Sequence, residues 1–423
     1  MSAEDTLREL KDWLQTNGGY FHPGVRLQKV DSGFSVVAGE SLPPDNKIVS
    51  CPFSLAITKH TTLKALSVLL GSTTNMSAWT ERQLIASYLC FHWIIGDDKS
   101  STNILAHLPY VKSLPSRDKL RTPLHFTENE LQQLQGSNLY GATLDRGREW
   151  NAEWQNCRSA ISTVNGEWAD QFTWELYLTA ATHLSSRAFP STLISQNLSL
   201  TSPSDPEPIL LPGVDSLNHR RAEPVSWVQS YLGTGPVPEP GSSISLVLHN
   251  PTPAGTELFN NYGAKPNSEL ILGYGFAMRD NPDDTIVLKI GGMEGKKWEV
   301  GRDARGADGV WDSVLGIMTA GAEPTYEDYL DAAGALEEMA QGLLDKLPGE
   351  GPRPDTRDDV ARMIDQYLEG KHYGTMCRRA KPRTSGQRDI LEALVLYAGA
   401  KSELGLAMAK EQGIEIGLES ESE

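Results

Sequence analysis

Two short segments of the chain gather side chains that could bind a small polar ligand. The first, Leu210–Arg221 (LLPGVDSLNHRR), runs from apolar residues into Asn218 and His219. The second is Glu257–Phe276 (ELFNNYGAKPNSELILGYGF), which begins some forty residues later. Asn and His side chains near a strand end offer both hydrogen-bond donors and acceptors. The first segment could therefore hold a ligand that carries polar groups of both kinds.

Aromatic residues dominate the second segment. Tyr262 and Tyr274 are each followed by glycine, and Phe276 comes directly after the second Tyr-Gly pair. A glycine lets the backbone approach a ligand closely, and aromatic rings can form a pocket for a cation. The same residues also fit a turn and a capped helix with packed aromatic side chains. On residue types alone, this structural interpretation is favoured.

Several other chemistries lack their motifs. The chain has no GxGxxG, no GxxxxGK[ST], no HExxH and no GxSxG. Its four cysteines form no CxxC pair, which excludes a four-thiolate zinc site. His219 near Asp215 comes closest to a metal-binding pair, and a lone pair of this kind is more typical of a structural hydrogen bond. We therefore expect no metal.

Composition narrows the classes of partner. The 423 residues include 38 Lys and Arg against 55 Asp and Glu, a net charge of −17. This balance argues against direct binding to nucleic acid, which needs clustered cations, and is compatible with a Lys-rich protein partner. No apolar run approaches the ~18 residues of a membrane helix, and the first ten residues do not resemble a signal peptide. With scattered cysteines, the chain is expected in the cytosol or the nucleus, without membrane contact.

The surrounding sequence predicts the elements that position these segments. Short Val- and Ile-rich runs between residues 25 and 58 indicate strands, whereas residues 60–185 show mostly helical periodicity, with Thr80 and Gln83 as a capping box. Ile244–His249 is predicted as a strand, Pro266–Gly273 as a short helix, and the region after about residue 300 as helical. The pattern predicts an α+β unit with a large helical insertion, followed by a helical domain.

Three motifs in a fixed order resemble the signature of the SET-domain protein methyltransferases. They are the segment Asp31–Ser50 (DSGFSVVAGESLPPDNKIVS), the Asn-His motif DSLNH and the tyrosine motif ELFNNYG…YGF. The long insertion and the helical C-terminal region are similar to the branch with the Rubisco large-subunit and ribosomal-protein methyltransferases. This resemblance implies a SET domain of small β-sheets with a threaded C-terminal segment, followed by an all-α substrate-binding domain. Its parts would be residues 1–59, the insertion 60–185, the C-terminal SET segment 186–295 and the helical domain 296–423.

The resemblance implies S-adenosylmethionine as the methyl donor and a protein lysine as the acceptor, on a ribosomal protein or translation factor of basic character. It implies that Tyr262 is catalytic, that Phe189 and Tyr274 line the lysine channel, and that the chain acts as a monomer. The residues that it places at the cofactor are Ser32, Gly33, Phe34, Arg187, Asp215, Asn218, His219, Tyr262 and Phe276.

Two positions bear on the acceptor, and one departs from the family pattern. Ser35 stands where the family has the second glycine of Gly-x-Gly. Lys265 stands where a histidine-methylating member of this branch has an arginine. Phe189 stands where the histidine-specific relatives carry a polar residue, which favours lysine as the acceptor. The alternatives are a protein-histidine methyltransferase and a catalytically inactive SET-like scaffold that binds a partner.

Overall fold

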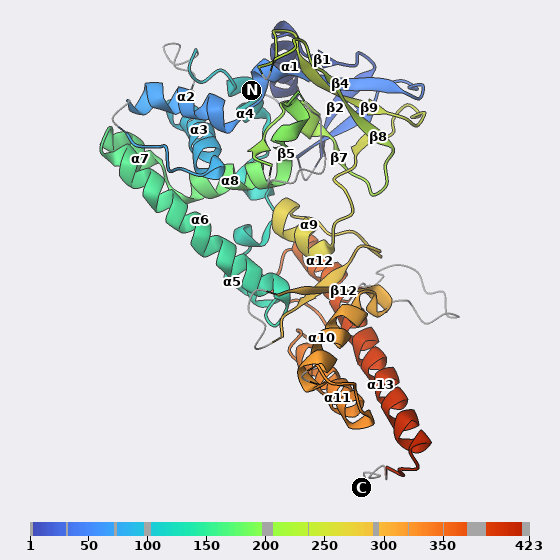
Figure 1. Cartoon of the computed structure of the whole chain (residues 1–423). Coiled ribbons are helices and arrows are strands. Elements are labelled where there is room, and N and C mark those ends of the chain that lie inside the picture. Colours follow the sequence, from blue (N-terminus) through green and yellow to red (C-terminus); the bar gives the residue numbers. More distant parts are fainter. Residues whose placement is uncertain are drawn as a thin grey trace. The chain divides into compact units, whose positions relative to one another are not determined.

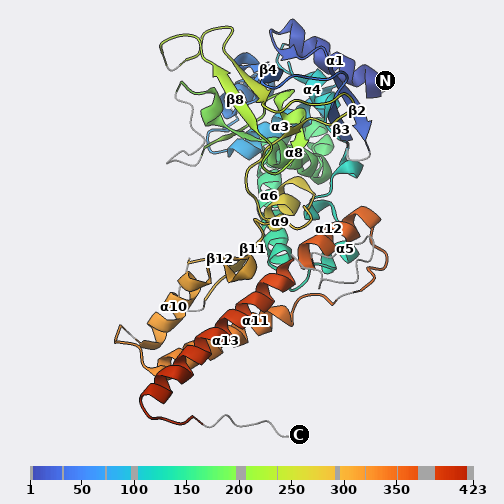
Figure 2. The same cartoon turned by 90° about the vertical axis from the view of Figure 1, so that its right-hand side faces the viewer.

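The computed structural model describes residues 3–30, 33–71, 74–96, 103–196, 206–235, 237–290, 296–319, 321–349, 351–369 and 386–416. Packing divides the chain into two compact units (Figures 1 and 2). The first comprises residues 1–120 and 146–264, and the second comprises residues 121–145 and 265–423. These two units are defined by packing and do not correspond to the four segments predicted from the sequence. The boundaries of those four segments stay predictions. In the described ranges, no helix is long and apolar enough to cross a membrane.

A four-stranded antiparallel sheet organises the first unit. Its order is β1 (Tyr20–Phe21), β4 (Asn46–Pro52), β9 (Ser243–Leu248) and β8 (Val225–Ser230). The predicted strand at Ile244–His249 corresponds to β9, whereas β8 was not predicted. The buried side of the sheet contributes to an apolar core that includes Val49, Ile244 and Leu246, each fully buried. Burial of these β-branched and leucine side chains supplies much of the driving force for folding this unit.

Three smaller strand pairs complete the β structure that is described in this unit. The hairpin β2 (Val25–Val30) and β3 (Gly33–Ala38) is antiparallel, as are β5 (Phe189–Pro190) and β6 (Pro208–Ile209). The pair β7 (Asn218–His219) and β10 (Phe259–Asn260) is parallel.

Helices account for most of the other regular structure described in the first unit, as the periodicity of residues 60–185 predicted. They are α1 (Ala3–Thr16), α2 (Lys59–Leu70), α3 (Glu81–Ile95), α4 (Leu108–Ser113), α7 (Gly166–Gln171), α8 (Trp174–Arg187) and the C-terminal part of α6 (Asn138–Ser162), with short 3₁₀ turns η1 (Phe53–Leu55), η2 (Arg117–Lys119), η4 (Ser191–Ile194) and η5 (Val214–Ser216). The predicted capping box at the start of α3 is confirmed. Thr80 Oγ1 accepts the Gln83 N–H, and Gln83 Oε1 accepts the Thr80 N–H.

The second unit is mainly helical, which confirms the predicted character of the C-terminal region. Its elements are η3 (Pro123–His125), α5 (Glu128–Gln132), α9 (Asn267–Tyr274), η6 (Arg302–Ala304), α10 (Ala307–Thr319), α11 (Tyr326–Leu344), α12 (Asp358–Leu368) and α13 (Gln387–Glu411). One antiparallel pair, β11 (Thr285–Leu288) with β12 (Trp298–Gly301), lies among them. The segment from residue 296 was predicted to be all helical, so β12 is a correction to that expectation.

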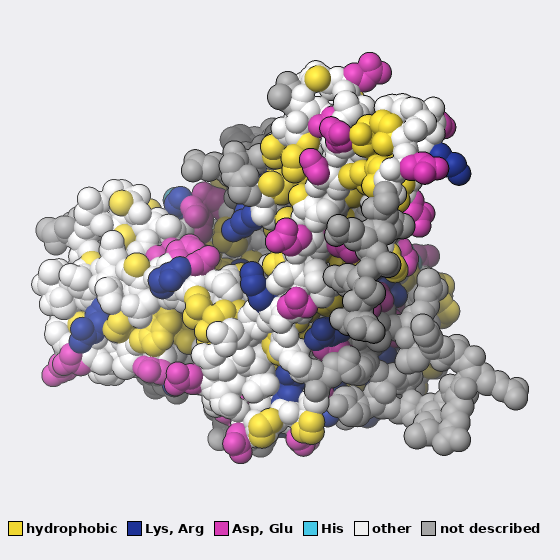
Figure 3. Space-filling model, turned by 90° about the horizontal axis from the view of Figure 1, so that it is seen from below, with side chains coloured by type: hydrophobic (Ala, Val, Ile, Leu, Met, Phe, Trp, Pro, Cys, Tyr) yellow, Lys and Arg dark blue, Asp and Glu magenta, His cyan; other side chains and the backbone are white. Residues whose placement is uncertain are grey.

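Long helices give the second unit its core. Helix α11 packs along α13, and α10 packs on α11, as both ribbon views show (Figures 1 and 2). Leu336 of α11 and Leu394 of α13 are fully buried in this core. The outer surface is acidic along α11, where five carboxylates occur without a Lys or Arg: Glu327, Asp328, Asp331, Glu337 and Glu338. On the face seen in Figure 3, acidic side chains lie among apolar ones.

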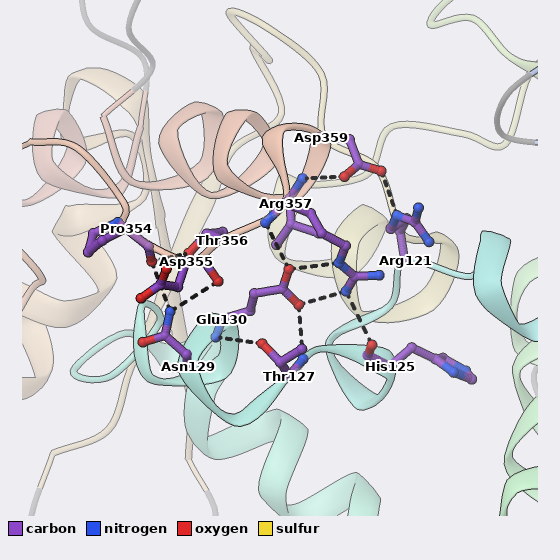
Figure 4. A network of polar contacts seen from close by, with 11 residues as sticks. Arg121, His125, Thr127, Asn129, Glu130, Pro354, Asp355, Thr356, Arg357 and Asp359 are labelled. Carbon is purple, nitrogen blue, oxygen red and sulfur yellow. Dashed lines mark hydrogen bonds and ion pairs between the residues drawn. The ribbon is translucent and has the colours of Figure 1, made fainter.

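A network of ion pairs fastens residues 121–130 to the start of α12 (Figure 4). The buried Glu130 carboxylate accepts hydrogen bonds from the Arg357 side chain, with Nε at 2.7 Å and Nη2 at 2.6 Å, and from the Arg357 N–H at 3.1 Å. Arg121 pairs with Asp359 beside it. Arg121 also supports the end of α9, because Gly275 at φ +81° packs so closely that a Cβ there would lie 2.8 Å from the Arg121 carbonyl carbon.

Candidate functional site

The two motif segments lie side by side in the first unit. The chain between Thr256 and Asn260 runs between β3 and β7. On one side, the Leu258 N–H donates to the Val36 carbonyl at 2.7 Å. On the other side, Phe259 and Asn260 pair in parallel register with Asn218 and His219. The structure thus brings together motifs some forty residues apart, as the sequence analysis expected.

Tyr262 is joined to the Asn-His segment by both its backbone and its side chain. Its N–H donates to Nδ1 of His219 at 3.0 Å, and its phenol O–H donates to the Leu217 carbonyl at 2.8 Å. The two rings stack, with centroids 5.0 Å apart and planes 26° apart. Because Nδ1 of His219 accepts, the proton of the neutral imidazole is on Nε2. Both the tautomer of His219 and the position of the phenol are therefore set locally.

The turn that carries Tyr262 is fixed by its two asparagines. Asn260 is buried, and its Oδ1 accepts hydrogen bonds from the Trp227 indole N–H at 3.2 Å and from the Asn261 N–H at 2.8 Å. Oδ1 of Asn261 in turn accepts the Gly263 N–H at 3.0 Å. Side-chain to backbone bonds of this kind hold a turn without a regular ladder. Trp227, on the unpredicted strand β8, is one of the partners that the sequence did not reveal.

The buried side chain of Asp215 supports the Asn-His segment. Its side chain is 1% exposed and accepts three hydrogen bonds: from the Tyr110 hydroxyl at 2.7 Å, from Arg187 Nη1 at 3.2 Å and from the Gly213 N–H at 3.2 Å. These partners satisfy a buried carboxylate that would otherwise be costly. Asp215 therefore acts as a support for the segment. Tyr110 of α4 was not predicted, because nothing in the sequence connects positions 105 residues apart.

Arg187, at the last residue of α8, is the cation of this cluster. Its Nη1 also donates to the Asp215 carbonyl at 3.0 Å. Burial acts to lower the pKa of Arg187, but the charge and hydrogen bond of Asp215 together with the contributions of Tyr110 and Tyr262 outweigh it, so the pKa is raised. Arg187 is thus bonded to Asp215, another of the predicted residues, while its role at the cofactor stays a prediction.

Asn218 is held by two residues to which the sequence analysis gave no role. Its Nδ2 donates to Glu257 Oε1 at 2.7 Å and to Ser35 Oγ at 3.3 Å. Ser35 Oγ donates to the same Glu257 oxygen at 2.8 Å. Glu257 belongs to the motif ELFNNYG, and Ser35 is the departure from the family's Gly-x-Gly. The signal was present in the sequence, but only the fold shows that the two side chains meet.

The remaining predicted residues of the first unit lie on neighbouring strands. Gly33 and Phe34 begin β3, with Gly33 at φ +135°, a conformation that favours glycine. Phe189 on β5 is buried and packs edge-on against Trp227, with ring centroids 5.6 Å apart. Ser32 lies outside the described residues.

Tyr274 and Phe276 belong to the second unit, at the end of α9. Their rings make an edge contact with centroids 6.2 Å apart. Burial raises the pKa of Tyr274, although Lys265 acts to lower it. Lys265 pairs with Glu269 at 3.1 Å. Whether Tyr274 and Phe276 line the site of Tyr262 stays a prediction. Among the residues that the structure describes, no group of three or more His, Cys, Asp or Glu side chains could hold a metal ion.

The arrangement was compared with known proteins. No protein-family model matches the sequence. The structure superimposes on the SET domain of Rubisco LSMT, in a crystal structure with lysine and AdoHcy, with a TM-score of 0.73 over 98% of this chain and 96% of that one, at 16% identity. This chain has the SET-domain fold.

Two curated relatives agree with the SET-domain fold. The ribosomal lysine N-methyltransferase set10 of Schizosaccharomyces pombe is 32% identical over 280 residues, which cover 65% of this chain and 46% of that protein. Ribosomal lysine N-methyltransferase 1 of Saccharomyces cerevisiae is 26% identical over 328 residues, 68% of this chain and 52% of that protein. The chain spans about half the length of the curated relatives that it matches.

These comparisons confirm the resemblance and the fold class that the sequence predicted for the SET domain. The roles given to Tyr262, Asn218 and the other site residues stay predictions.

Proposed function

We propose that the chain is an S-adenosylmethionine-dependent protein-lysine N-methyltransferase whose reaction takes place beside Tyr262. The observation that carries the proposal is the contact between the two motifs. On a SET-domain fold, Tyr262 is hydrogen-bonded to His219 and to Leu217. The curated relatives are named as ribosomal lysine methyltransferases, and the superimposed LSMT structure contains lysine and AdoHcy.

The polar groups of the first unit fit such a cofactor. S-adenosylmethionine supplies a methyl group on a sulfonium, next to an amino-acid part and an adenine. Asn218, its Nδ2 held by Glu257, offers Oδ1 as an acceptor, and Gly33 with Phe34 offer backbone groups at the start of β3. The Arg187 guanidinium, which donates to the Asp215 carbonyl at 3.0 Å, supplies a cation beside the Asn-His segment. The described residues thus provide donors and acceptors for both polar parts.

The protein must also present a neutral amine. An unperturbed lysine has a pKa near 10.4, so deprotonating it at pH 7 costs roughly 4–5 kcal/mol. Burial of the amine in a channel reduces this cost because it disfavours the charged form. The Tyr262 proton is directed to the Leu217 carbonyl, so its phenol oxygen can accept a hydrogen bond from the amine. Alignment of this kind is worth about 7–11 kcal/mol in well-oriented reactions.

The substrate that we propose is a Lys-rich ribosomal protein or translation factor. The names of the relatives, the net charge of −17 and the acidic surface of α11 support this class. Opposite charge raises the rate of association with a basic protein without fixing its identity. We further propose that the chain acts as a monomer in the cytosol or the nucleus.

The experiment is a methylation assay with methyl-labelled S-adenosylmethionine and two substrate fractions, total ribosomal proteins and soluble translation factors. Acid hydrolysis of the labelled protein should yield methyllysine, and Tyr262→Phe should reduce the rate of incorporation about 10²–10³-fold. Label recovered only as methylhistidine would replace lysine by histidine as the acceptor. Absence of both labelling and cofactor binding would instead favour the inactive scaffold.

A further inference from the structure

Three backbone segments meet at Glu257. The Ala38 N–H donates to the Thr256 carbonyl at 2.9 Å, and Val37 forms an antiparallel bridge with Glu257, so this residue lies against β3. Two residues later, Phe259 pairs in register with Asn218. Main-chain pairing on both sides of this segment therefore places the Glu257 side chain between Ser35 and Asn218. The contacts of Glu257 with these two residues do not depend on a flexible loop.

The chemistry of Glu257 fixes the orientation of the Asn218 amide. A carboxylate can only accept hydrogen bonds, so the amide atom 2.7 Å from Glu257 Oε1 must be the NH₂ group. The Ser35 hydroxyl strengthens this arrangement because it donates to the same carboxylate oxygen and accepts from the same NH₂ group. With its donors occupied, Asn218 turns its carbonyl oxygen Oδ1 away from Glu257. An amide in this orientation selects for a donor in its ligand.

We propose that Glu257 and Ser35 are positioning residues that lock the Asn218 amide, so that Asn218 Oδ1 recognises the α-ammonium group of the cofactor's amino-acid part. The inference rests on the proposed function, which supplies the cofactor. Without the lock, the amide could rotate by half a turn and present NH₂ to the ammonium, which would repel it. Ser35 thus gives the chain a contact that the family's glycine could not provide.

A comparison of two ligands tests the lock. The first ligand is S-adenosylhomocysteine, and the second is the same molecule with the α-ammonium replaced by hydrogen. Isothermal titration calorimetry would give Kd values for the wild-type chain, Glu257→Ala, Glu257→Gln and Ser35→Ala. Ser245→Ala is the matched control, because Ser245 is a buried serine of the same unit whose hydroxyl donates to Ser50 at 3.1 Å. Thermal unfolding of each variant would show that it is folded at the temperature of titration.

The lock predicts a loss that depends on the ammonium. Glu257→Ala should raise the Kd of S-adenosylhomocysteine roughly ten-fold, the scale of a hydrogen bond to a charged group. The Kd of the deaminated ligand should stay within about two-fold of the wild-type value. Ser35→Ala should show the same selectivity with a smaller loss. Glu257→Gln should retain most of the affinity, because its amide oxygen can accept the same two bonds. Ser245→Ala should change neither Kd.

Three results would overturn the inference. Equal weakening of both ligands by Glu257→Ala would indicate a merely structural role, and unchanged binding in Glu257→Ala and Ser35→Ala would show that no lock exists. A loss in Glu257→Gln as large as in Glu257→Ala would mean that charge, rather than orientation, matters. Failure of the wild type to bind S-adenosylhomocysteine at all is a different result, since it would remove the proposed function itself.

Discussion

The N–H of Tyr262 donates a 3.0 Å hydrogen bond to Nδ1 of His219, while the two rings stack. The bond comes from the backbone, so it survives any change of the Tyr262 side chain that keeps the ring. The hydroxyl has a separate task, because it donates to the Leu217 carbonyl. The local structure and the chemistry of Tyr262 can therefore be separated by experiment.

Tyr262→Phe should keep the fold and the cofactor affinity but lose most of the turnover. The ring and the backbone bond remain, whereas the oxygen that would orient the amine is gone. Removal of one well-placed catalytic hydrogen bond typically costs about 10²–10³ in kcat. The measurement is a single-turnover methylation assay together with calorimetry of S-adenosylmethionine binding. Tyr231→Phe is the control, since its hydroxyl donates to the Gly235 carbonyl elsewhere in the unit. Unchanged turnover in Tyr262→Phe would remove Tyr262 from the catalytic residues.

Asp215→Ala should strongly destabilise the first unit. It leaves the buried Tyr110 hydroxyl without its acceptor and Arg187 without its carboxylate. Loss of one partner of a buried ion pair costs about 3–5 kcal/mol of unfolding free energy. Urea denaturation would measure this change. Asp170→Ala is the matched control, because Asp170 is 82% exposed and pairs with Arg158 at 3.4 Å, a surface pair worth about 1 kcal/mol or less. Equal effects of the two substitutions would contradict a supporting role for Asp215.

Glu130→Ala should loosen the second unit by opening the network of Figure 4. Burial acts to raise the pKa of Glu130, but the hydrogen bonds from Arg357 and Thr127 outweigh it and lower the pKa to about 2. Because the folded pKa lies below the unfolded value near 4.3, the stabilisation is present above that value and is lost as the pH falls toward 2. We expect a loss of about 2 kcal/mol at pH 7, measured by thermal unfolding.

The control for Glu130 is Glu269→Ala. Glu269 pairs with Lys265 at 3.1 Å on the same unit, but its side chain is 57% exposed. This variant should change the stability by less than about 1 kcal/mol. A similar Tm for Glu130→Ala and wild type would show that the network does not fasten residues 121–130.

Local patterns in the sequence were sufficient to predict individual helices and strands, but not the segments with which these elements pair. The spacing of Leu7, Leu10 and Leu14 is typical of a helix, and α1 buries all three side chains. Strand β8 was missed because its residues are mostly half-exposed and show no clean alternation of apolar and polar side chains. Propensity and periodicity describe a segment by itself, whereas a strand of this kind is defined by its neighbour β9.

The candidate site shows this limit of sequence-based prediction more clearly. The resemblance placed Asn218, His219 and Tyr262 in one site, and their pairing in the structure agrees. Tyr110 and Glu257 act through contacts across 105 and 39 residues, which no spacing rule predicts. Such partners become visible only when the fold brings distant segments together.

The last prediction concerns acid stability. His107 is buried between the Tyr88 hydroxyl, 2.6 Å from Nδ1, and the Leu55 carbonyl, 3.2 Å from Nε2. Burial, assisted by nearby His92, lowers the pKa of His107 to about 3, and burial lowers the pKa of His92 to about 4. Both folded values lie below the unfolded value near 6.5. The neutral rings therefore stabilise the first unit above pH 6.5, and this contribution is lost as the pH falls from 6.5 toward 3–4.

His107→Gln should reduce the pH dependence of unfolding between pH 6.5 and 4. Glutamine offers a donor and an acceptor but does not titrate, so the slope should fall by up to about one proton. The slope would be measured by urea denaturation of each variant at a series of pH values. His60→Gln, a change at an exposed histidine of the same unit, should leave the slope unchanged. If the slopes of His107→Gln and the wild type coincide, His107 does not cause the acid sensitivity.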